Sequence, residues 1–492
     1  MTSDAAAAPD ASVHRPSRRF IWITFTLFLL GQLFAYAQAF KVRPASDDWP
    51  IINEVHRGNQ QGVGVFFTDS VIRIGYRPLK SLAIWFFGNL SQDEAARFAW
   101  IRVLHLTGAV CYALVAVAWL RALPIGLAGA GAVILLMFLH PVLAAPVGSI
   151  DGIDTLMSST LLWLGAWCCW RFRSRLLTAT ITTAACFVVG VGFKENLFAL
   201  VPLAVVVVML FWPRERRMIG CACVGGTLAI LAAAAILVRR FVIRGGLEAG
   251  ANMLDFSPRQ LAENVALFAS GLLFFGNTVW VYVHQSAAVL AMVGGSCLTV
   301  LALVTTGLGR KIAPVPIYFP MLGLMIAAFP TILLYHVSEM YVAPMLLPFA
   351  MIVALAVDGL CASRAGRVIA SVVAAVVVMS SVLTIRSKVA GLVDVGERAD
   401  RQLRQVLEFV PPGTKGTKIL LRFDPNDLPP RRTYSVFRMG DEILLVHRQT
   451  PEWLRQGDGI ELQSDRFDLF DPKDFDIVLK WDAKQQKFDR IK

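Results

Sequence analysis

The stretch PIGLAGAGAVILLMFLHPVLAA, residues 124–145, contains no charged side chain. An α-helix rises about 1.5 Å per residue, so about 20 apolar residues are enough to cross the hydrocarbon core of a bilayer. Backbone amides and carbonyls inside lipid must pair within their own segment, which requires a helix. The stretch therefore predicts a membrane-spanning helix that ends near His140 and Pro141.

Apolar runs of similar length recur along the chain, and many of the loops between them carry Arg or Lys. The runs predict an all-α polytopic membrane protein with about 11 transmembrane helices, at residues 20–40, 98–120, 124–145, 153–170, 177–193, 196–212, 218–238, 286–308, 316–335, 341–360 and 367–384. A further run, 265–283, is predicted to be re-entrant or interfacial. If this run crossed the membrane, Arg310 and Lys311 would lie on the outer side, against the tendency of basic loops to lie in the cytoplasm.

Basic residues set the predicted orientation. Arg15, Arg18 and Arg19 place the N-terminal tail, residues 1–19, in the cytoplasm. The apolar runs that follow form the predicted membrane module, residues 20–385. The end of the first run resembles a signal-peptidase site, but its length and the many later spans favour an uncleaved anchor. Three segments then lie outside, namely a first outer loop at 41–97, a second outer loop at 239–264 and the C-terminal region 386–492.

Composition agrees with this architecture and excludes other classes. The 492 residues are 56% hydrophobic and 17% charged, whereas a soluble protein carries about 25% charged residues. The net charge of +12 belongs largely to loops, so nucleic-acid binding is disfavoured. No nucleotide-binding Gly-rich loop is present, which argues against ATP-driven transport. All eight cysteines lie in or beside apolar runs, where they are expected to pack as small apolar residues.

The C-terminal region, 386–492, changes to a charged composition and predicts a small α+β domain outside the membrane. A helix is expected at 395–409, because Pro411, Pro412 and Gly413 end it. Short strands are expected afterwards, at 418–423, 434–438, 442–448, 476–481 and 487–491. No catalytic constellation is evident in this domain, and a role as a lid or support is favoured over substrate binding.

Acidic and basic residues gather at the predicted outer face, and a reason is needed for so many charges at a membrane boundary. Carboxylates there suit proton abstraction or metal binding, and cations suit a lipid-linked phosphate. Each residue alone also has a simpler reading as a turn, a helix cap, a membrane anchor or an internal ion pair. The candidates are Asp47, Asp48, Arg73, Tyr76, Arg77, His140, Asp151, Asp154, Lys194 and Glu195.

The order of these motifs resembles the GT-C superfamily of membrane glycosyltransferases that use polyprenyl- or dolichyl-phosphate sugars. It is most similar to bacterial relatives of the TMTC-type protein O-mannosyltransferases. The motifs are Asp47-Asp48, Tyr76-Arg77-Pro78-Leu79, His140-Pro141, Phe193-Lys194-Glu195-Asn196 and Ser338-Glu339-Met340-Tyr341-Val342-Ala343-Pro344. The chain has Met340 where the family often has Arg, and it lacks the usual Arg near Asp151 and Asp154.

The resemblance implies sugar transfer with inversion, from a polyprenyl-phosphate donor to a glycan, lipid or protein acceptor at the periplasmic face of the bacterial inner membrane. Asp48, or else Asp47, is then the general base, while Arg77 and Lys194 neutralise the leaving phosphate. His140 assists the phosphate or orients a carboxylate, Glu195 holds Lys194, and Glu339 and Tyr341 line the cavity. Some branches of the family use a divalent cation such as Mg²⁺ or Mn²⁺, for which Asp47, Asp48, Asp151 and Asp154 are the candidate ligands.

Two other functions remain open from the sequence. A flippase or transporter of lipid-linked sugars is expected to show paired half-repeats and broken helices near the midplane, and neither is evident. A non-catalytic scaffold that presents the C-terminal domain to partner proteins does not explain the carboxylates and cations at the outer membrane boundary. The enzyme is therefore the favoured hypothesis, with the transporter second.

Overall fold

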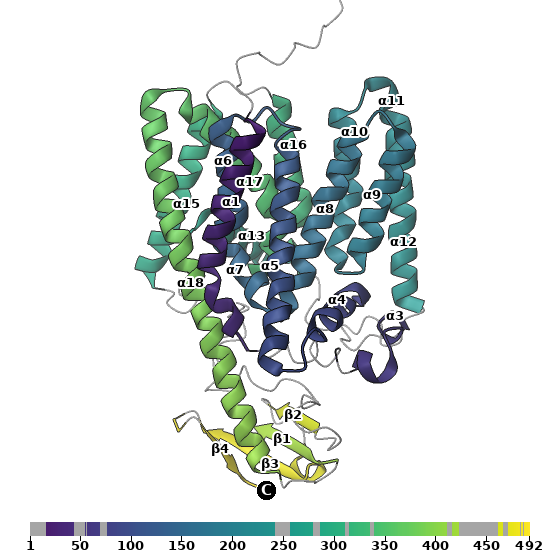
Figure 1. Cartoon of the computed structure of the whole chain (residues 1–492), viewed down its shortest axis with the longest axis vertical. Helices are drawn as coiled ribbons and strands as arrows, with labels where there is room; N and C mark the ends of the chain where they lie inside the picture. The colour runs from purple at the N-terminus through teal and green to yellow at the C-terminus, as the bar shows by residue number, and fades with distance from the viewer. Residues whose placement is uncertain are drawn as a thin grey trace, which may run out of the picture.

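The protein is a bundle of long helices with a small β-sheet beyond one of its ends (Figure 1). This computed structural model describes residues 16–43, 55, 57–68, 76–241, 256–278, 286–309, 314–334, 339–410, 416–422, 461–465 and 471–492 except 483 and 486.

Seven helical segments in the described residues are long and apolar enough to cross a membrane, and they give the protein a multi-pass architecture. They are Arg18–Ala35 (α1), Ala95–Trp119 (in α5, Glu94–Trp119), Leu127–Gly148 (α6, Leu127–Leu139, with η2, Pro141–Leu143, and α7, Ala144–Gly148), Arg214–Arg240 (α11, Arg214–Gly220, with η5, Cys221–Gly225, and α12, Gly226–Phe241), Ala287–Leu308 (α15), Glu339–Cys361 (η6, Glu339–Val342, with α17, Ala343–Cys361) and Arg364–Glu408 (α18).

Four more of the predicted runs form helices that are shorter or more polar. These are α8 (Ile153–Arg171), α9 (Leu176–Val191), η4 with α10 (Glu195–Ala199 and Leu200–Phe211) and α16 (Pro314–Ile332). Buried Asp154, Ser158 and Ser159 lower the apolar character of α8, which is therefore suited to protein neighbours rather than lipid. The prediction of a mostly helical chain with several long apolar helices is thus confirmed. Of the described residues, only seven segments meet the length and composition expected of a span, against about 11 predicted.

The two ends of the bundle differ in their residues. One end, called the basic end here, carries many of the arginines that flank the long helices, including Arg18, Arg121, Arg171, Arg214 and Arg364. The opposite end, called the tail end, carries the C-terminal sheet together with α3 (Val65–Thr68) and α4 (Pro78–Gly88) (Figure 1).

The chain after α1 meets the long helix α18 at the tail end. Arg43 follows η1 (Ala37–Lys41), and its Nη1 lies 2.6 Å from Oδ2 of Asp400 on α18. A Cβ added to Gly396 would also contact the backbone of Arg43. The end of the first helix and the start of the C-terminal domain therefore lie on the same side of the bundle.

Helix α13 (Pro258–Leu273) stays at the tail end instead of crossing the bundle. Near its start, the Asn264 side-chain amide donates to the carbonyls of Ile332 and Leu334, at 2.7 and 2.9 Å. Near its end, the Leu272 carbonyl lies 3.0 Å from Nε2 of His140. This helix begins inside the residues predicted as the second outer loop, because Ser257 caps it and Pro258 starts its first turn.

Small residues allow the central helices to approach closely. Gly307 of α15 and Gly359 of α17 face each other so that a Cβ on either would strike the other helix's backbone. At the basic end, Asp358 accepts hydrogen bonds from the backbone amides of Gly126 and Gly129, at 2.6 and 2.8 Å, and caps α6 from the neighbouring α17. Close contacts between small residues are typical of helices that associate in membranes.

The predicted helix at 395–409 is the last part of α18, which continues without a break from the last membrane run. Its face with Val395, Ala399 and Leu403 packs on the sheet, because β1 and β3 offer alternate apolar residues to that side. The sheet has the order β2-β1-β3-β4, with β1 parallel to β2 and β3, and β4 antiparallel to β3. Its strands are Lys418–Arg422, Glu461–Asp465, Ile477–Asp482 and Lys487–Arg490. Runs 434–438 and 442–448 lie outside the described residues.

Candidate functional site

Asp154 is the centre of an ionic cluster at the tail end. Its side chain is fully buried at the start of α8 and lies within ion-pair distance of three cations. Nη1 of Arg77 is 2.5 Å from Oδ2, Nζ of Lys80 is 3.7 Å from the same oxygen, and Nζ of Lys194 is 3.2 Å from Oδ1. A buried carboxylate with three cationic neighbours stays charged at low cost, and it also holds those cations in place.

Local sequence explains how two of the cations reach Asp154. Arg77 precedes Pro78, which disfavours a helical backbone at Arg77 and makes it the residue before α4. Lys80 follows in the first turn of the same helix. The amide of Leu79 donates to the carbonyl of Gly192 at 3.0 Å, which attaches α4 to the end of α9.

Lys194 and Glu195 occupy the short link between α9 and α10. Lys194 is extended, and its ammonium group donates to Oγ1 of Thr155 at 2.7 Å. The same nitrogen lies 5.1 Å from the ring centre of Tyr341, which is a cation–π distance. Lys194 therefore has defined contacts on η6 as well as on α8.

The outer part of the cluster is more open. Oε1 of Glu195 is 3.2 Å from Nη2 of Arg77, and Oε2 is 3.7 Å from Nη2 of Arg239 at the end of α12. The side chain of Glu195 is 33% exposed, against 0% for Asp154. We call Arg77, Lys80, Lys194, Arg239, Asp154 and Glu195 the cationic cluster, because four of its six members are cations. Arg77 and Lys80 have further interactions besides these ion pairs.

Tyr76 borders the open part of this cluster. Its carbonyl accepts a hydrogen bond from Arg239 at 2.9 Å, and its hydroxyl donates to the carbonyl of Phe67 at 3.0 Å. Burial raises the pKa of Tyr76 above its usual value near 10, an effect that Arg239 opposes only in part. The phenol therefore stays protonated at neutral pH and acts as a hydrogen-bond donor.

Comparison with known proteins assigns no family to this arrangement. No protein-family model matches the chain, and no curated protein matches it.

A second ionic site lies at the tail end, between η6 and α18. Nζ of Lys388 is 2.5 Å from Oε1 of Glu339, and Oγ1 of Thr278 donates to the same oxygen at 2.5 Å. Lys388 also donates to the carbonyl of Pro141 at 3.4 Å. Both charged side chains are buried, so this pair connects α18 to the ends of α6 and α17. The structure thus places Glu339 with Lys388 and not with the cationic cluster.

His140 belongs to this second site. Its Nδ1 accepts from the amide of Val142 at 3.3 Å, so the neutral ring carries its proton on Nε2 and donates to the Leu272 carbonyl at 3.0 Å. Both ring nitrogens have backbone partners, and the side chain is fully buried. The resemblance implies that His140 assists the phosphate or orients a carboxylate, whereas in the structure it joins α6 to α13.

Other predicted residues cannot be placed in the site. Asp47, Asp48 and Arg73 lie outside the described residues, and so does any contact that they make. Asp151 belongs to η3 (Ile150–Gly152), three residues before Asp154, and only its backbone is described. Among the described residues no group of three or more His, Cys, Asp or Glu side chains is arranged to hold a metal ion. The carboxylate of Asp154 already pairs with three cationic side chains, which makes it a poor ligand for a metal ion.

Several residues in these two sites were not singled out from the sequence. Lys80 lies three residues after Arg77, a spacing that places both at the start of one helix, and this signal was available. Arg239 follows an apolar run in the manner of an ordinary flanking cation. Lys388 follows the last predicted span, and Thr155 and Thr278 are small polar residues with no distinctive pattern.

The Lys388 pair yields a prediction for stability. Replacing Lys388 with Met leaves Glu339 charged and buried, and we expect the free energy of unfolding to fall by about 3–5 kcal/mol. The double variant Lys388→Met/Glu339→Gln removes both charges and should recover most of that loss. Unfolding by SDS in mixed micelles measures both variants. A double variant less stable than Lys388→Met would contradict the pairing.

Proposed function

We propose that the protein is an integral-membrane glycosyltransferase that moves a sugar from a polyprenyl-phosphate donor to an acceptor at the tail end, with inversion. The cationic cluster carries the proposal. It gathers Arg77, Lys194 and Arg239 at a membrane boundary. The buried carboxylate of Asp154 forms ion pairs with Arg77 and Lys194. Cations in such a setting suit a phosphate group that belongs to a lipid.

The chemistry of the donor explains why cations are needed. A sugar joined to a lipid phosphate is a phosphodiester with one negative charge. When the bond from the anomeric carbon to oxygen breaks, the electron pair stays on the phosphate, which gains a second negative charge. Groups that bind this added charge lower the barrier, because they interact more strongly with the transition state than with the donor.

The acceptor supplies the other half of the reaction. Its hydroxyl oxygen or amine nitrogen forms the new bond to the anomeric carbon from the face opposite the leaving phosphate. Its proton passes to a base, for which Asp48 is the first candidate and Asp47 the second on the order of the sequence motifs. Arg77 and Lys194 bind the phosphate, while Arg239 and Glu195 form the open edge of the site.

The location follows from charge. The arginines of the basic end favour the cytoplasmic side, so the tail end and its cationic cluster face the periplasm of a bacterial inner membrane. A donor then reaches the site from the bilayer and an acceptor from the aqueous side.

Sugar transfer from radiolabelled polyprenyl-phosphate sugars, by purified protein in nanodiscs with membrane extract as acceptor, tests this function. We expect wild type to transfer label, Asp48→Asn or Asp47→Asn to lose transfer, and Asp93→Asn to keep it. Asp93 is a matched control, since it caps α5 at the tail end and Asn caps a helix equally well. No transfer by wild type from any donor, with movement of donor across sealed vesicles, would instead support the flippase.

A further inference from the structure

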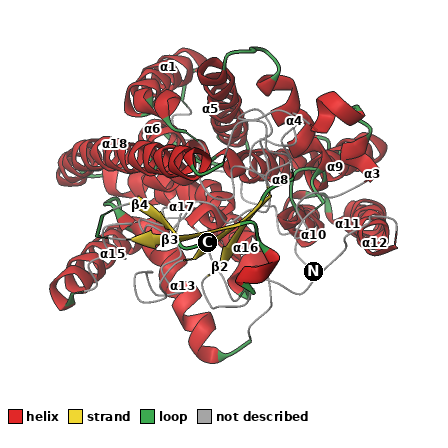
Figure 2. Ribbon diagram, turned by 90° about the horizontal axis from the view of Figure 1, so that it is seen from below, coloured by secondary structure: helices red, strands yellow, loops and turns green. Residues whose placement is uncertain are grey.

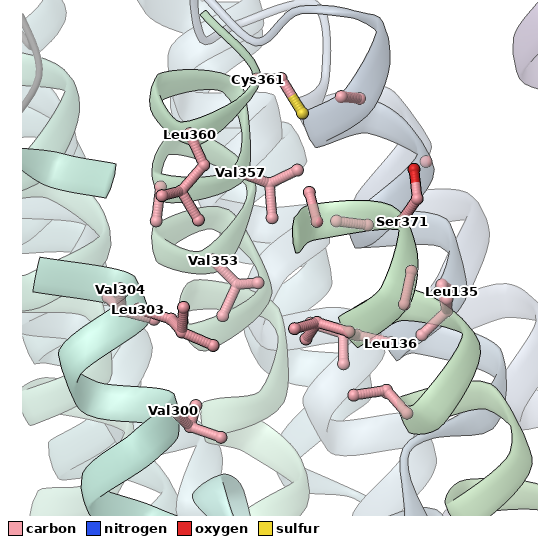
Figure 3. Close-up of a pocket in the computed structure, with 18 of the residues that line it drawn as sticks. Leu135, Leu136, Val300, Leu303, Val304, Val353, Val357, Leu360, Cys361 and Ser371 are labelled. Carbon is pink, nitrogen blue, oxygen red and sulfur yellow. The ribbon is translucent and has the colours of Figure 1, made fainter. Parts of the chain in front are cut away.

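A cavity of about 360 Å³ lies among α6, α15, α17 and α18 (Figure 3). It is separate from the cationic cluster, and Phe275 and Phe349 of its lining contact the ring of His140 in the second ionic site. Figure 3 shows Val353 and Val357 of α17 on the same side of the view as the lining residues of α15, with Ser371 of α18 on the other side. Of all the residues that line it, only Ser371 and Cys361 carry a polar side-chain atom. A water molecule needs two to four polar partners, so this cavity is suited to an apolar occupant.

The helices around the cavity present apolar side chains to the outside. Leu298 on α15 is 67% exposed and Val376 on α18 is 61% exposed, which is expected where helices contact lipid chains. Both helices pack on α17, and the cavity lies between them. Viewed from the tail end, α15 and α18 lie on the opposite side of the bundle from α4 and α9 (Figure 2). The cationic residues Arg77 and Lys80 lie at the start of α4.

The cavity has the depth of one membrane leaflet. Its lining on α17 extends from Phe349 to Cys361. Twelve residues of helix rise about 18 Å, which is close to half of the hydrocarbon core. Since α17 ends at Cys361, the cavity reaches the basic end of the bundle, and Phe275, which follows α13, lines it toward the tail end.

Cations lie where the cavity reaches the basic end. Arg364 and Arg367 follow Cys361 directly and are exposed, and Nη1 of Arg367 donates to the Cys361 carbonyl at 3.4 Å. Ile369, which also lines the cavity, comes two residues after Arg367 on α18. An apolar cavity with Arg367 hydrogen-bonded to a lining residue, and with Arg364 one turn earlier on the same helix, matches a lipid that has an anionic head group.

We propose that this cavity binds one acyl chain of an anionic phospholipid in the leaflet at the basic end, with the lipid phosphate on Arg364 and Arg367. Such a lipid fills the space between α15 and α18 and joins two helices that otherwise meet through α17. The site is separate from the cationic cluster and does not depend on the proposed transferase activity.

Photo-crosslinking in nanodiscs tests the site. Phosphatidylglycerol and phosphatidylcholine probes, each with a photoreactive group on one acyl chain, are compared at equal mole fraction, and labelled peptides are mapped by mass spectrometry. We expect phosphatidylglycerol to label the cavity residues of α15, α17 and α18 about tenfold more than phosphatidylcholine, because two arginines attract the anionic head group. Exposed Ile230 on α12 reports ordinary lipid contact and should show no preference.

Two glycine variants separate the cavity from general lipid contact. A Cβ added to Gly131, which lines the cavity on α6, or to Gly294, which does not line it, would contact nothing within 4 Å. Gly131→Phe should fill the cavity and remove the cavity labelling, while Gly294→Phe should leave it unchanged. If Gly131→Phe fails to fold, Ala374→Phe fills the same space from α18.

The head-group contact has its own variant. Arg364→Gln/Arg367→Gln should keep cavity labelling but lose the preference for phosphatidylglycerol. Equal labelling by both probes in wild type would overturn the anionic head group, and unchanged labelling in a folded cavity-filling variant would overturn the site.

Discussion

Lys194→Met is expected to lower kcat for sugar transfer by about 10²–10³-fold, the range found when one preorganised charge-stabilising group is removed. Lys194 is 6% exposed at its side chain, and Asp154, Thr155 and Tyr341 hold its ammonium group in position. The group is thus ready to meet the charge that develops on the leaving phosphate, and it does not have to reorganise. KM for the donor should change less than kcat, because the intact donor carries less negative charge than the transition state.

Two variants show whether the charge of Lys194 matters. Lys194→Arg keeps the charge with a different shape and should retain more activity than Lys194→Met. Arg259→Met removes an exposed cation from the tail end, outside both ionic sites, and should transfer sugar as wild type does. A folded Lys194→Met protein with wild-type kcat would contradict the role proposed for the cationic cluster.

The helical architecture was predictable because a span needs only length and apolar composition, both of which are local properties of the sequence. The joined helix α18 was not foreseen, since Arg386 and Lys388 interrupt the apolar run between 384 and 395. Charged residues end an apolar stretch that can span a membrane, but they do not end the α-helix, which continues through Arg386 and Lys388. The burial of Lys388 against Glu339 is a long-range contact that no local pattern indicates.

The site was predictable where a residue was unusual for its segment. Lys194 and Glu195 stand between two apolar runs, and Arg77 precedes a Pro, so all three were candidates, and the structure brings them together with Asp154. His140 was an equally unusual residue. Its hydrogen bond to the Leu272 carbonyl depends on how α13 folds back against α6, and the sequence does not show this.

Replacing Asp154 with Asn is expected to destabilise the fold by about 3–5 kcal/mol, because it leaves Lys80 and Lys194 buried next to Arg77 without their shared carboxylate. Repulsion among three neighbouring cations adds to the cost of keeping them away from water. The loss should appear in the free energy of unfolding measured by SDS titration in mixed micelles. Since α8 carries Asp154 between α4 and the α9–α10 link, local separation of these elements is the expected first step of unfolding.

Asp400 provides the matched control, since it also pairs with two arginines, Arg43 at 2.6 Å and Arg404 at 3.1 Å. Those partners are 46% and 65% exposed at their side chains, so water solvates the arginines when the carboxylate is removed. Asp400→Asn should therefore cost no more than about 1 kcal/mol. If both variants lost the same small amount, Asp154 would not be the buried counter-ion that holds the cationic cluster, and the phosphate site built on it would lose its support.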